Sequence, residues 1–386
     1  MSPEYVRQLS SVTHGQLSKP PGFWFKLHLD PILLGALLLL TAGGLFILFS
    51  ASGQSESIMT RQSIYLAIGF VVMALFAQVP PRIFCRWAPW VYLIGLALLV
   101  AVLLFGTGAK GAQRWIAVPG MSSVRFQPSE IMKLVMPIVV AWFLSKHIVP
   151  PSFKAVIGTL LLVAIPVGLI AKQPDLGTSL LVAAAGIFVL LLAGLRWRFI
   201  FGAVMLAVPA VYVMWHFVMR EYQKQRVLTF LEPEKDPWGA GWNIIQSKVA
   251  IGSGGIHGKG WLAGTQSHLD FLPESHTDFI IAVLAEEFGL IGVVLLLCVY
   301  AVIITRGIII SAKAQTLFGK LLAGSVTLTF FVYIFVNIGM VSGLLPVVGV
   351  PLPLVSRGGT SIVTLMAGFG ILMSIHTHRT LLGRTT

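Results

Sequence analysis

Acidic side chains are scarce in this sequence. Only 14 of its 386 residues are Asp or Glu, against 27 Lys and Arg, while 56% of the residues are hydrophobic. A mean hydropathy of +0.88 excludes a soluble globular protein, because such a chain would have nowhere to expose its apolar surface. The composition therefore predicts a protein that crosses a membrane many times.

Two further shortages narrow the possibilities. The only cysteines are Cys85 and Cys298, and both fall toward the predicted cytoplasmic side, so we expect no disulfide. The chain has no Ser-x-x-Lys arrangement, which excludes a penicillin-binding transpeptidase. It also has no basic run interleaved with aromatic residues, so nucleic acid is not an expected partner.

Long apolar runs dominate what is present. Each is close to the roughly 20 residues that a helix needs to cross a bilayer. We therefore expect an all-α membrane bundle of about ten helices. The runs lie near residues 31–50, 64–79, 87–106, 129–145, 155–171, 177–195, 198–219, 279–305, 319–343 and 358–376.

The distribution of Lys and Arg predicts the orientation, because short loops rich in these residues stay in the cytoplasm. With an even number of helices, residues 1–30 and the tail 380–386 are both expected inside, flanking one membrane domain over 31–379. The segments 107–128 and 220–278 then face outward. Most acidic residues fall on this outer side, so the chemistry is expected to face away from the cytoplasm.

A cluster of ionisable residues ends the second outer segment. Glu274, His276 and Asp278 occupy the last positions before the eighth apolar run. Zinc is not expected here, because the His-x-Asp spacing is not a recognised zinc pattern and no cysteine lies on this side. A loosely held Mg²⁺ that bridges Asp278 and a substrate phosphate is left open.

Ionisable residues also fall within the apolar runs. Glu130 and Lys133 are three residues apart in the fourth run, hence on one face of a helix. Such residues usually face the bundle interior or a water-filled cavity. They form either a self-neutralising structural pair or part of a substrate-lined site. Glu286 and Glu287 lie two turns into the eighth helix, where a buried hydrogen-bonding role is favoured.

Two features of the segment 220–278 have local explanations. Residues 238–251 combine two Trp with apolar residues at helical spacing, which predicts a helix lying in the membrane interface. The following Gly-rich stretch, 252–260, lacks the spacing of a phosphate-binding loop and has no preceding strand. We expect a flexible outer loop there.

The last apolar run begins with an arrangement suited to anions. Ser356, Arg357 and two glycines precede it, where unpaired backbone N–H groups at a helix start favour negative charge. The plainer interpretation is a capped helix start. The net charge of +13 similarly fits contact with anionic membrane lipids on the inner side, while the outer Lys and Arg residues suit a phosphate-bearing substrate.

Five ordered motifs carry a resemblance to the SEDS family (shape, elongation, division and sporulation), and the chain is most similar to its elongation-type members. The resemblance extends from about residue 31 to residue 379. The motifs are Gly111-Ala-Gln-Arg114-Trp115-Ile, Gln127-Pro-Ser-Glu130-x-x-Lys133, Lys172-Gln-Pro-Asp175-Leu-Gly-Thr-Ser, Phe271-Leu-Pro-Glu274-x-His276-Thr-Asp278-Phe and Pro351-Leu-Pro-Leu-Val-Ser356-x-Gly-Gly.

The resemblance implies a peptidoglycan glycosyltransferase. Such an enzyme polymerises lipid II into lipid-linked glycan strands at the outer face of the inner membrane, for cell elongation and rod shape. It implies a class B penicillin-binding protein as partner, and it places the essential Asp of the large outer loop on Asp278. This chain departs from the family at Arg357, where Tyr is usual.

The implied chemistry needs only one carboxylate. A lipid-linked donor leaves as a pyrophosphate, which requires cations rather than a general acid, and Asp278 is the candidate base. The candidate substrate-binding residues are Arg114, Trp115, Glu130, Lys133, Lys248, Glu274, His276, Ser356 and Arg357. Two other functions remain as alternatives: a transporter that flips the lipid precursor, and a scaffold that docks a penicillin-binding protein.

Overall fold

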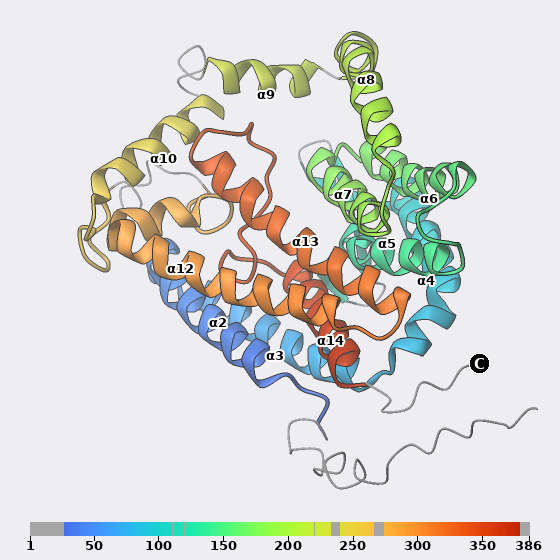
Figure 1. Cartoon of the computed structure of the whole chain (residues 1–386). Helices are drawn as coiled ribbons and strands as arrows, with labels where there is room; N and C mark the ends of the chain where they lie inside the picture. Colours follow the sequence, from blue (N-terminus) through green and yellow to red (C-terminus); the bar gives the residue numbers. More distant parts are fainter. Residues whose placement is uncertain are drawn as a thin grey trace, which may run out of the picture.

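The computed structural model is a helical bundle (Figure 1). The structure describes residues 27–109, 112–118, 121–219, 221–232, 240–265 and 274–378. Its helices are α2 (Pro31–Ala51), α3 (Glu56–Gln78), α4 (Pro81–Phe105), α5 (Pro128–Ser145), α6 (Phe153–Lys172), α7 (Leu176–Leu192), α8 (Trp197–Val213), the π-helix η2 (Met214–Val218), α9 (Glu221–Leu231), α10 (Ala240–Gly254), α12 (Ile280–Ala312), α13 (Leu317–Val341) and α14 (Thr360–Thr377).

Ten of these helices correspond to the ten predicted apolar runs. Within the described ranges, nine spans are long and apolar enough to cross a membrane, and α7 is a shorter apolar helix of 17 residues. The protein is therefore a multi-pass membrane protein, as predicted. The largest difference in bounds is at α3, which begins at Glu56 rather than near residue 64.

Short polar side chains set several helix starts. Asp30 accepts a hydrogen bond from the Leu33 N–H at 2.9 Å and caps α2, which has Pro31 in its first turn. Asp175 caps α7 by accepting from the Thr178 N–H at 3.3 Å, and its other oxygen accepts from the Gln127 amide at 3.0 Å. These bonds fix the start of α7 against the start of α5.

The outer segment 107–128 differs from the prediction. It was expected as a loop in an all-α protein, but it holds a small antiparallel sheet of order β1–β2–β3, with strands Thr107–Ala109, Ala112–Val118 and Met121–Phe126. The strands are short and mix polar with apolar residues, so they never form a long apolar run and hydropathy gives no sign of them. The sheet contacts α4 and α5.

Side-chain contacts between distant segments define two faces of the bundle. On one face, Asp30 at the start of α2 pairs with Arg306 near the end of α12. On the other face, the Ser275 hydroxyl donates to the Ala51 carbonyl at 3.0 Å, which joins the end of α2 to the segment before α12. Both described chain ends lie on the first face, in agreement with an even number of crossings.

The centre of the bundle is formed by α5, α13 and α14, whose spans are more than half buried. Helices α2 and α3 lie against α12 and α14, respectively. At the edge of the molecule, α9 extends between α8 and α10 (Figure 1). The candidate site lies at the second face, where the connection between α13 and α14 folds over this central layer.

Candidate functional site

Residues 342–359, which we call the α13–α14 connection, organise the candidate site. The Asn337 amide of α13 donates to the Val350 carbonyl at 2.7 Å, and the Tyr300 hydroxyl of α12 donates to the Pro353 carbonyl at 2.7 Å. Asn337 and Tyr300 are 0% and 1% exposed. Buried polar groups of this kind fix a backbone strongly, because leaving them unpaired is costly.

Asp278 lies at the mouth of α12, beside this connection. Its backbone carbonyl accepts a second hydrogen bond from the Asn337 amide, at 2.9 Å. Its carboxylate lies against Gly349, where an added Cβ would sit 3.5 Å from Oδ2. The side chain is partly exposed. One buried amide thus fixes both the backbone of Asp278 and the loop beside it.

His276 and Arg357 form a contact on the other side of the same turn. The Arg357 N–H donates to the His276 carbonyl at 2.9 Å, and the guanidinium Nη1 lies 3.2 Å from His276 Nε2. Burial and the adjacent Arg357 charge lower the pKa of His276, against the opposing effect of Glu274. A neutral imidazole accepts from the guanidinium and orients it.

Arg357 and Arg61 line one cavity of about 240 Å³. Arg61 comes from the second turn of α3, and the Gly358 and Gly359 backbone lies at the start of α14. Two guanidinium groups beside a helix N-terminus suit an anion with several oxygens, such as a pyrophosphate. The remaining lining residues are Ile58, Gln62, Tyr65 and Thr277.

Ser356 is buried within the same turn. It is 2% exposed, and its hydroxyl accepts from the Leu352 N–H at 2.9 Å. The Gln62 amide donates to the Ser356 carbonyl at 3.1 Å and accepts from the Gly358 N–H at 3.2 Å. The hydroxyl therefore closes the turn that presents Arg357, and its predicted contact with substrate stays a prediction.

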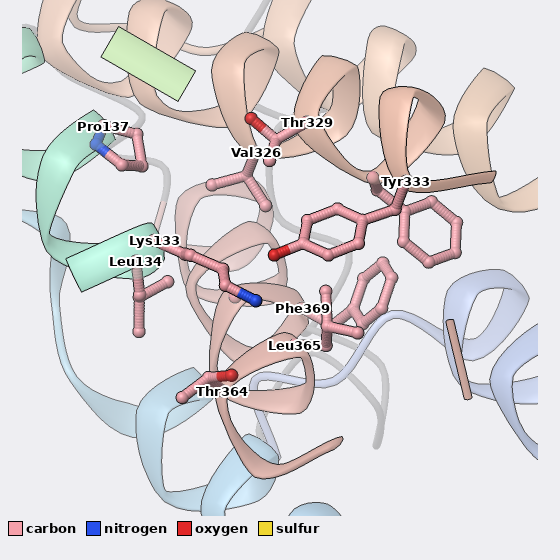
Figure 2. Close-up of a pocket in the computed structure, with 11 residues that line it drawn as sticks. Lys133, Leu134, Pro137, Val326, Thr329, Tyr333, Thr364, Leu365 and Phe369 are labelled. Carbon is pink, nitrogen blue, oxygen red and sulfur yellow. The ribbon is translucent and has the colours of Figure 1, made fainter. Parts of the chain in front are cut away.

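Glu130 and Lys133 are brought together as predicted. The Lys133 ammonium lies 2.6 Å from Glu130 Oε1, and both side chains are about nine-tenths buried. The ammonium also lies 5.0 Å from the centre of the Tyr333 ring of α13. Figure 2 shows Lys133 and Tyr333 directed toward one another in a cavity of about 40 Å³ between α5, α13 and α14.

Lys133 also reaches the α13–α14 connection. It lines a second small cavity with Ser356, Gly358 and the Pro351–Leu354 turn. Glu130 offsets the charge of Lys133, yet Lys133 lies next to the turn that holds Arg357. The two interpretations of this pair, structural and substrate-lining, are both compatible with that position.

Lys248 lies at the far end of the connection. It projects from α10, and its Cε and Nζ occupy the space beside Gly343, where an added Cβ would be 2.3 Å and 2.7 Å from them. Gly343 has a φ of +73°, a conformation that favours glycine. The connection thus has Lys248 near its start, Asp278 near its middle and Arg357 near its end.

Three other candidates lie at the border of the site. Glu274 is exposed with a φ of +62°, and its carboxylate accepts from the Thr277 hydroxyl at 2.7 Å. Arg114 and Trp115 are on β2, next to the outer ends of α4 and α5. The role of these two residues stays a prediction.

The expectation of a flexible Gly-rich loop at 252–260 is wrong. Backbone hydrogen bonds join this segment to α12, including one of 3.0 Å from the Lys259 N–H to the Glu286 carbonyl. Glu286 and Glu287 are 0% and 1% exposed. Their buried hydrogen-bonding role is as predicted, since Glu286 accepts from Lys259 and Glu287 accepts from Ser50.

Sequence reasoning missed Arg61, Gln62, Tyr333 and Asn337. Arg61 was assigned to a loop because α3 was expected to begin later. Asn337 and Tyr333 did carry a signal, since each is a polar group within an apolar run. In the part of the chain that the structure describes, no cluster of three or more His, Cys, Asp or Glu side chains is placed to hold a metal ion.

Fold and site together define a class: a polytopic membrane protein with a cation-lined cavity and a carboxylate at one face of the bundle. The comparisons give the family. Residues 29–381 match the model of the FtsW/RodA/SpoVE family, described as cell cycle proteins. The chain belongs to this family, which confirms the resemblance found in its motifs.

Similar proteins include curated enzymes. The chain is 56% identical over 363 residues to the peptidoglycan glycosyltransferase MrdB of Escherichia coli K12, covering 94% of this chain and 97% of that protein. It is 36% identical to a probable peptidoglycan glycosyltransferase FtsW of Trichlorobacter lovleyi, covering 90% and 92% of the two chains.

Solved structures of related proteins also match this fold. One chain from a peptidoglycan synthase complex, described as coordinating polymerization and crosslinking, matches with a TM-score of 0.80 at 30% identity, over 91% of this chain and 98% of that one. The rod shape determining protein RodA of Thermus thermophilus matches with a TM-score of 0.67 at 27% identity, over 90% and 96%.

Proposed function

We propose that this protein is a peptidoglycan glycosyltransferase that polymerises lipid II into glycan strands, with Asp278 as general base. The observation that carries the proposal is the turn 276–278. It places a carboxylate and an arginine-lined cavity side by side at one face of a membrane bundle. The 56% identity to a curated enzyme of this activity supports the same reaction.

Asp278 suits proton removal because of where it lies. Its backbone is fixed by Asn337 while its carboxylate is only partly buried. In the proposed step, the carboxylate takes the proton from the acceptor sugar hydroxyl as that oxygen attacks the anomeric carbon of the donor. The bond from the anomeric carbon to the pyrophosphate oxygen breaks, and the lipid diphosphate leaves.

The leaving group needs cations rather than an acid. Arg61 and Arg357 line the cavity next to Thr277, so they are placed to meet the charge that develops on the pyrophosphate. His276 orients Arg357. Lys133 lies one layer deeper, below Ser356 and Gly358, and Arg114 and Lys248 are further candidates for contact with phosphate. Trp115 suits stacking on a sugar.

The partner and location follow from the same proposal. A related chain was solved in a complex described as a peptidoglycan synthase that coordinates polymerization and crosslinking. We therefore infer that this chain works with a class B penicillin-binding protein. The excess of Lys and Arg in the opposite loops supports a site at the outer face of the inner membrane, toward the periplasm.

A direct test supplies purified protein with lipid II, with and without a class B penicillin-binding partner, and separates the products on a gel. The proposal predicts glycan polymer that requires this protein. Absence of polymer in both conditions, from well-folded protein, would overturn it. If the same preparation instead moved fluorescent lipid II across vesicle membranes, the transporter would replace the enzyme.

The orientation has its own test. Single cysteines at Glu234 and Lys313, in a background with Cys85 and Cys298 replaced, are exposed to an impermeant thiol reagent on whole cells. The proposed orientation predicts labelling at position 234 and none at 313. The reverse pattern would place the site in the cytoplasm.

A further inference from the structure

Helix α12 is interrupted at Gly289, which has non-helical torsion angles of φ 62° and ψ −159°. In a continuous helix, the Leu290 and Ile291 N–H groups would donate to the carbonyls of Glu286 and Glu287. Here these four backbone groups need other partners, because unpaired groups inside a bundle are costly. The partners come from residues 254–265, which we call the latch segment.

The latch segment supplies all four partners. The Lys259 and Gly260 N–H groups donate to the Glu286 and Glu287 carbonyls, each at 3.0 Å. In return, the Leu290 N–H donates to the Gly255 carbonyl at 3.0 Å and the Ile291 N–H donates to the Ile256 carbonyl at 3.2 Å. The outer segment therefore completes the hydrogen bonding of a broken membrane helix.

Two glycines make this close contact possible. An added Cβ at Gly258 would lie 2.1 Å from the Glu287 carbonyl oxygen, and Gly258 has a φ of +79°. At Gly254 an added Cβ would lie 1.9 Å from the Ala285 carbonyl oxygen. Backbone thus packs directly on backbone, and this close approach explains why the segment is rich in glycine.

A buried ion pair fastens the latch segment. The Glu286 side chain is 0% exposed, and its Oε1 accepts from the Lys259 ammonium at 2.8 Å, the Thr265 N–H at 2.8 Å and the Thr265 hydroxyl at 3.1 Å. Lys259 also donates to the Thr265 hydroxyl at 2.8 Å. A carboxylate at this depth is tolerated because it is paired and hydrogen-bonded.

The fastened half-helix leads directly to the proposed base. Residues 280–288 follow Asp278, and Glu286 is about 12 Å further along the helix axis at 1.5 Å per residue. The outer end of this half-helix is held by the bond from Asn337 to the Asp278 carbonyl at 2.9 Å. Its inner end is held by the latch segment. The mouth of α12 is therefore fixed at two points.

We propose that Lys259 and Glu286 are positioning residues, which set Asp278 for catalysis by docking the latch segment onto broken α12. This inference rests on the proposed function of Asp278. Releasing the latch segment lets the half-helix shift, and displacements of about 1 Å at a reacting group cost up to a hundredfold in rate. The effect falls on kcat, because neither residue lies in the arginine-lined cavity.

The test measures glycan polymerisation and hydrogen exchange on the full-length protein. We expect Lys259→Met to lower kcat for lipid II by on the order of tenfold or more, with KM little changed. Amide exchange should rise in peptides covering residues 255–265 and 286–292. Gly258→Ala should act likewise, because its methyl group cannot fit against Glu287.

Two further variants keep the result interpretable. Lys259→Met with Glu286→Gln leaves no unpaired charge and should recover part of the kcat, since the amide oxygen still accepts from Thr265. The matched control is Lys224→Met, which removes the exposed ion pair of Lys224 with Glu221 at 2.9 Å and should change neither readout.

The outcomes separate the two proposals. Faster exchange with an unchanged kcat in Lys259→Met would overturn the link to Asp278. Unchanged exchange would overturn the latch itself. Full activity in Asp278→Asn, measured in the same assay, would instead overturn Asp278 as the base. The hydrogen bonds between the latch segment and α12 would then be a structural feature only.

Discussion

At the end of the bundle where α2 begins, the Asp30 carboxylate is fully buried and accepts from Arg306 Nε at 3.0 Å and Nη2 at 2.6 Å. At the opposite end, Asp278 is partly exposed, and two arginines nearby line an open cavity. Both ends thus hold carboxylate and guanidinium groups. One end is a closed, bidentate pair, whereas the other includes a cavity lined by two guanidinium groups.

The difference shows that similar charged side chains can serve stability at one end of the bundle and ligand binding at the other. A closed, bidentate pair fixes helix ends and has no capacity left for a ligand. The cavity at the other end is lined by both Arg61 and Arg357, an arrangement suited to an anion.

The largest expected effect is the loss of the base. Asp278→Asn keeps the shape of the side chain but cannot take a proton, and general-base removal costs about a hundredfold to ten-thousandfold in rate. Lipid II polymerisation on a gel checks this, with membrane insertion and thermal unfolding as controls for folding. Glu274→Gln and Asp270→Asn should cost less, and equal losses in all three would undo the assignment.

The closed end should respond in stability instead. Arg306→Met leaves Asp30 buried without its partner, which costs about 3–5 kcal/mol of folding free energy. Thermal unfolding in detergent measures this loss. A variant with unchanged stability and impaired polymerisation would reverse the roles of the two ends.

The same pair predicts an acid dependence. Burial acts to raise the pKa of Asp30, but hydrogen bonds from Arg306 and the Leu33 N–H, with the Arg306 and His376 charges, bring it below its usual value. Its stabilisation is therefore present above a pH of about 4 and is lost as the pH falls through the lowered pKa. Asp30→Asn should flatten this part of the unfolding curve.

Arg357 tests the electrostatics of the open end. Arg357→Glu opposes a pyrophosphate beside Arg61 and should lower donor use about tenfold or more. Arg357→Tyr restores the residue usual in the family and should retain activity. Initial polymerisation rates at several lipid II concentrations compare the two, and equal losses would indicate packing rather than charge.

The buried pair is expected to give the smallest effect on activity if it is structural. Glu130→Gln with Lys133→Met leaves no uncompensated charge, so it should fold better than either single variant. Thermal unfolding and polymerisation together distinguish the roles. A stable but inactive double variant places Lys133 in the substrate site, and a fully active one removes both residues from the mechanism.

Features that depend on a local sequence pattern could be predicted from the sequence. Ten apolar runs gave ten helices, and the spacing of Glu130 and Lys133 correctly placed them in contact at 2.6 Å. The cluster at 274–278 was found because charged residues directly before an apolar run are conspicuous in so apolar a chain. Hydropathy and short-range spacing carry this information.

Features that depend on contacts between distant segments were not predicted. Arg61 lies next to Arg357 only because α3 packs on α14. The buried Ser356 hydroxyl and the latch on α12 likewise depend on how backbone groups find partners across the fold. A Gly-rich stretch shows that close approach of another segment is possible, but the sequence does not show that this segment is the break in α12 at Gly289.

The most direct test of the working end is a cryo-electron microscopy structure of the Asp278→Asn variant with lipid II bound. Our account predicts pyrophosphate density between Arg61 and Arg357, with a sugar hydroxyl within hydrogen-bonding reach of the substituted side chain. Pyrophosphate bound instead beside Glu130 and Lys133 in the interior, away from both arginines, would contradict the account and favour a route for lipid transport.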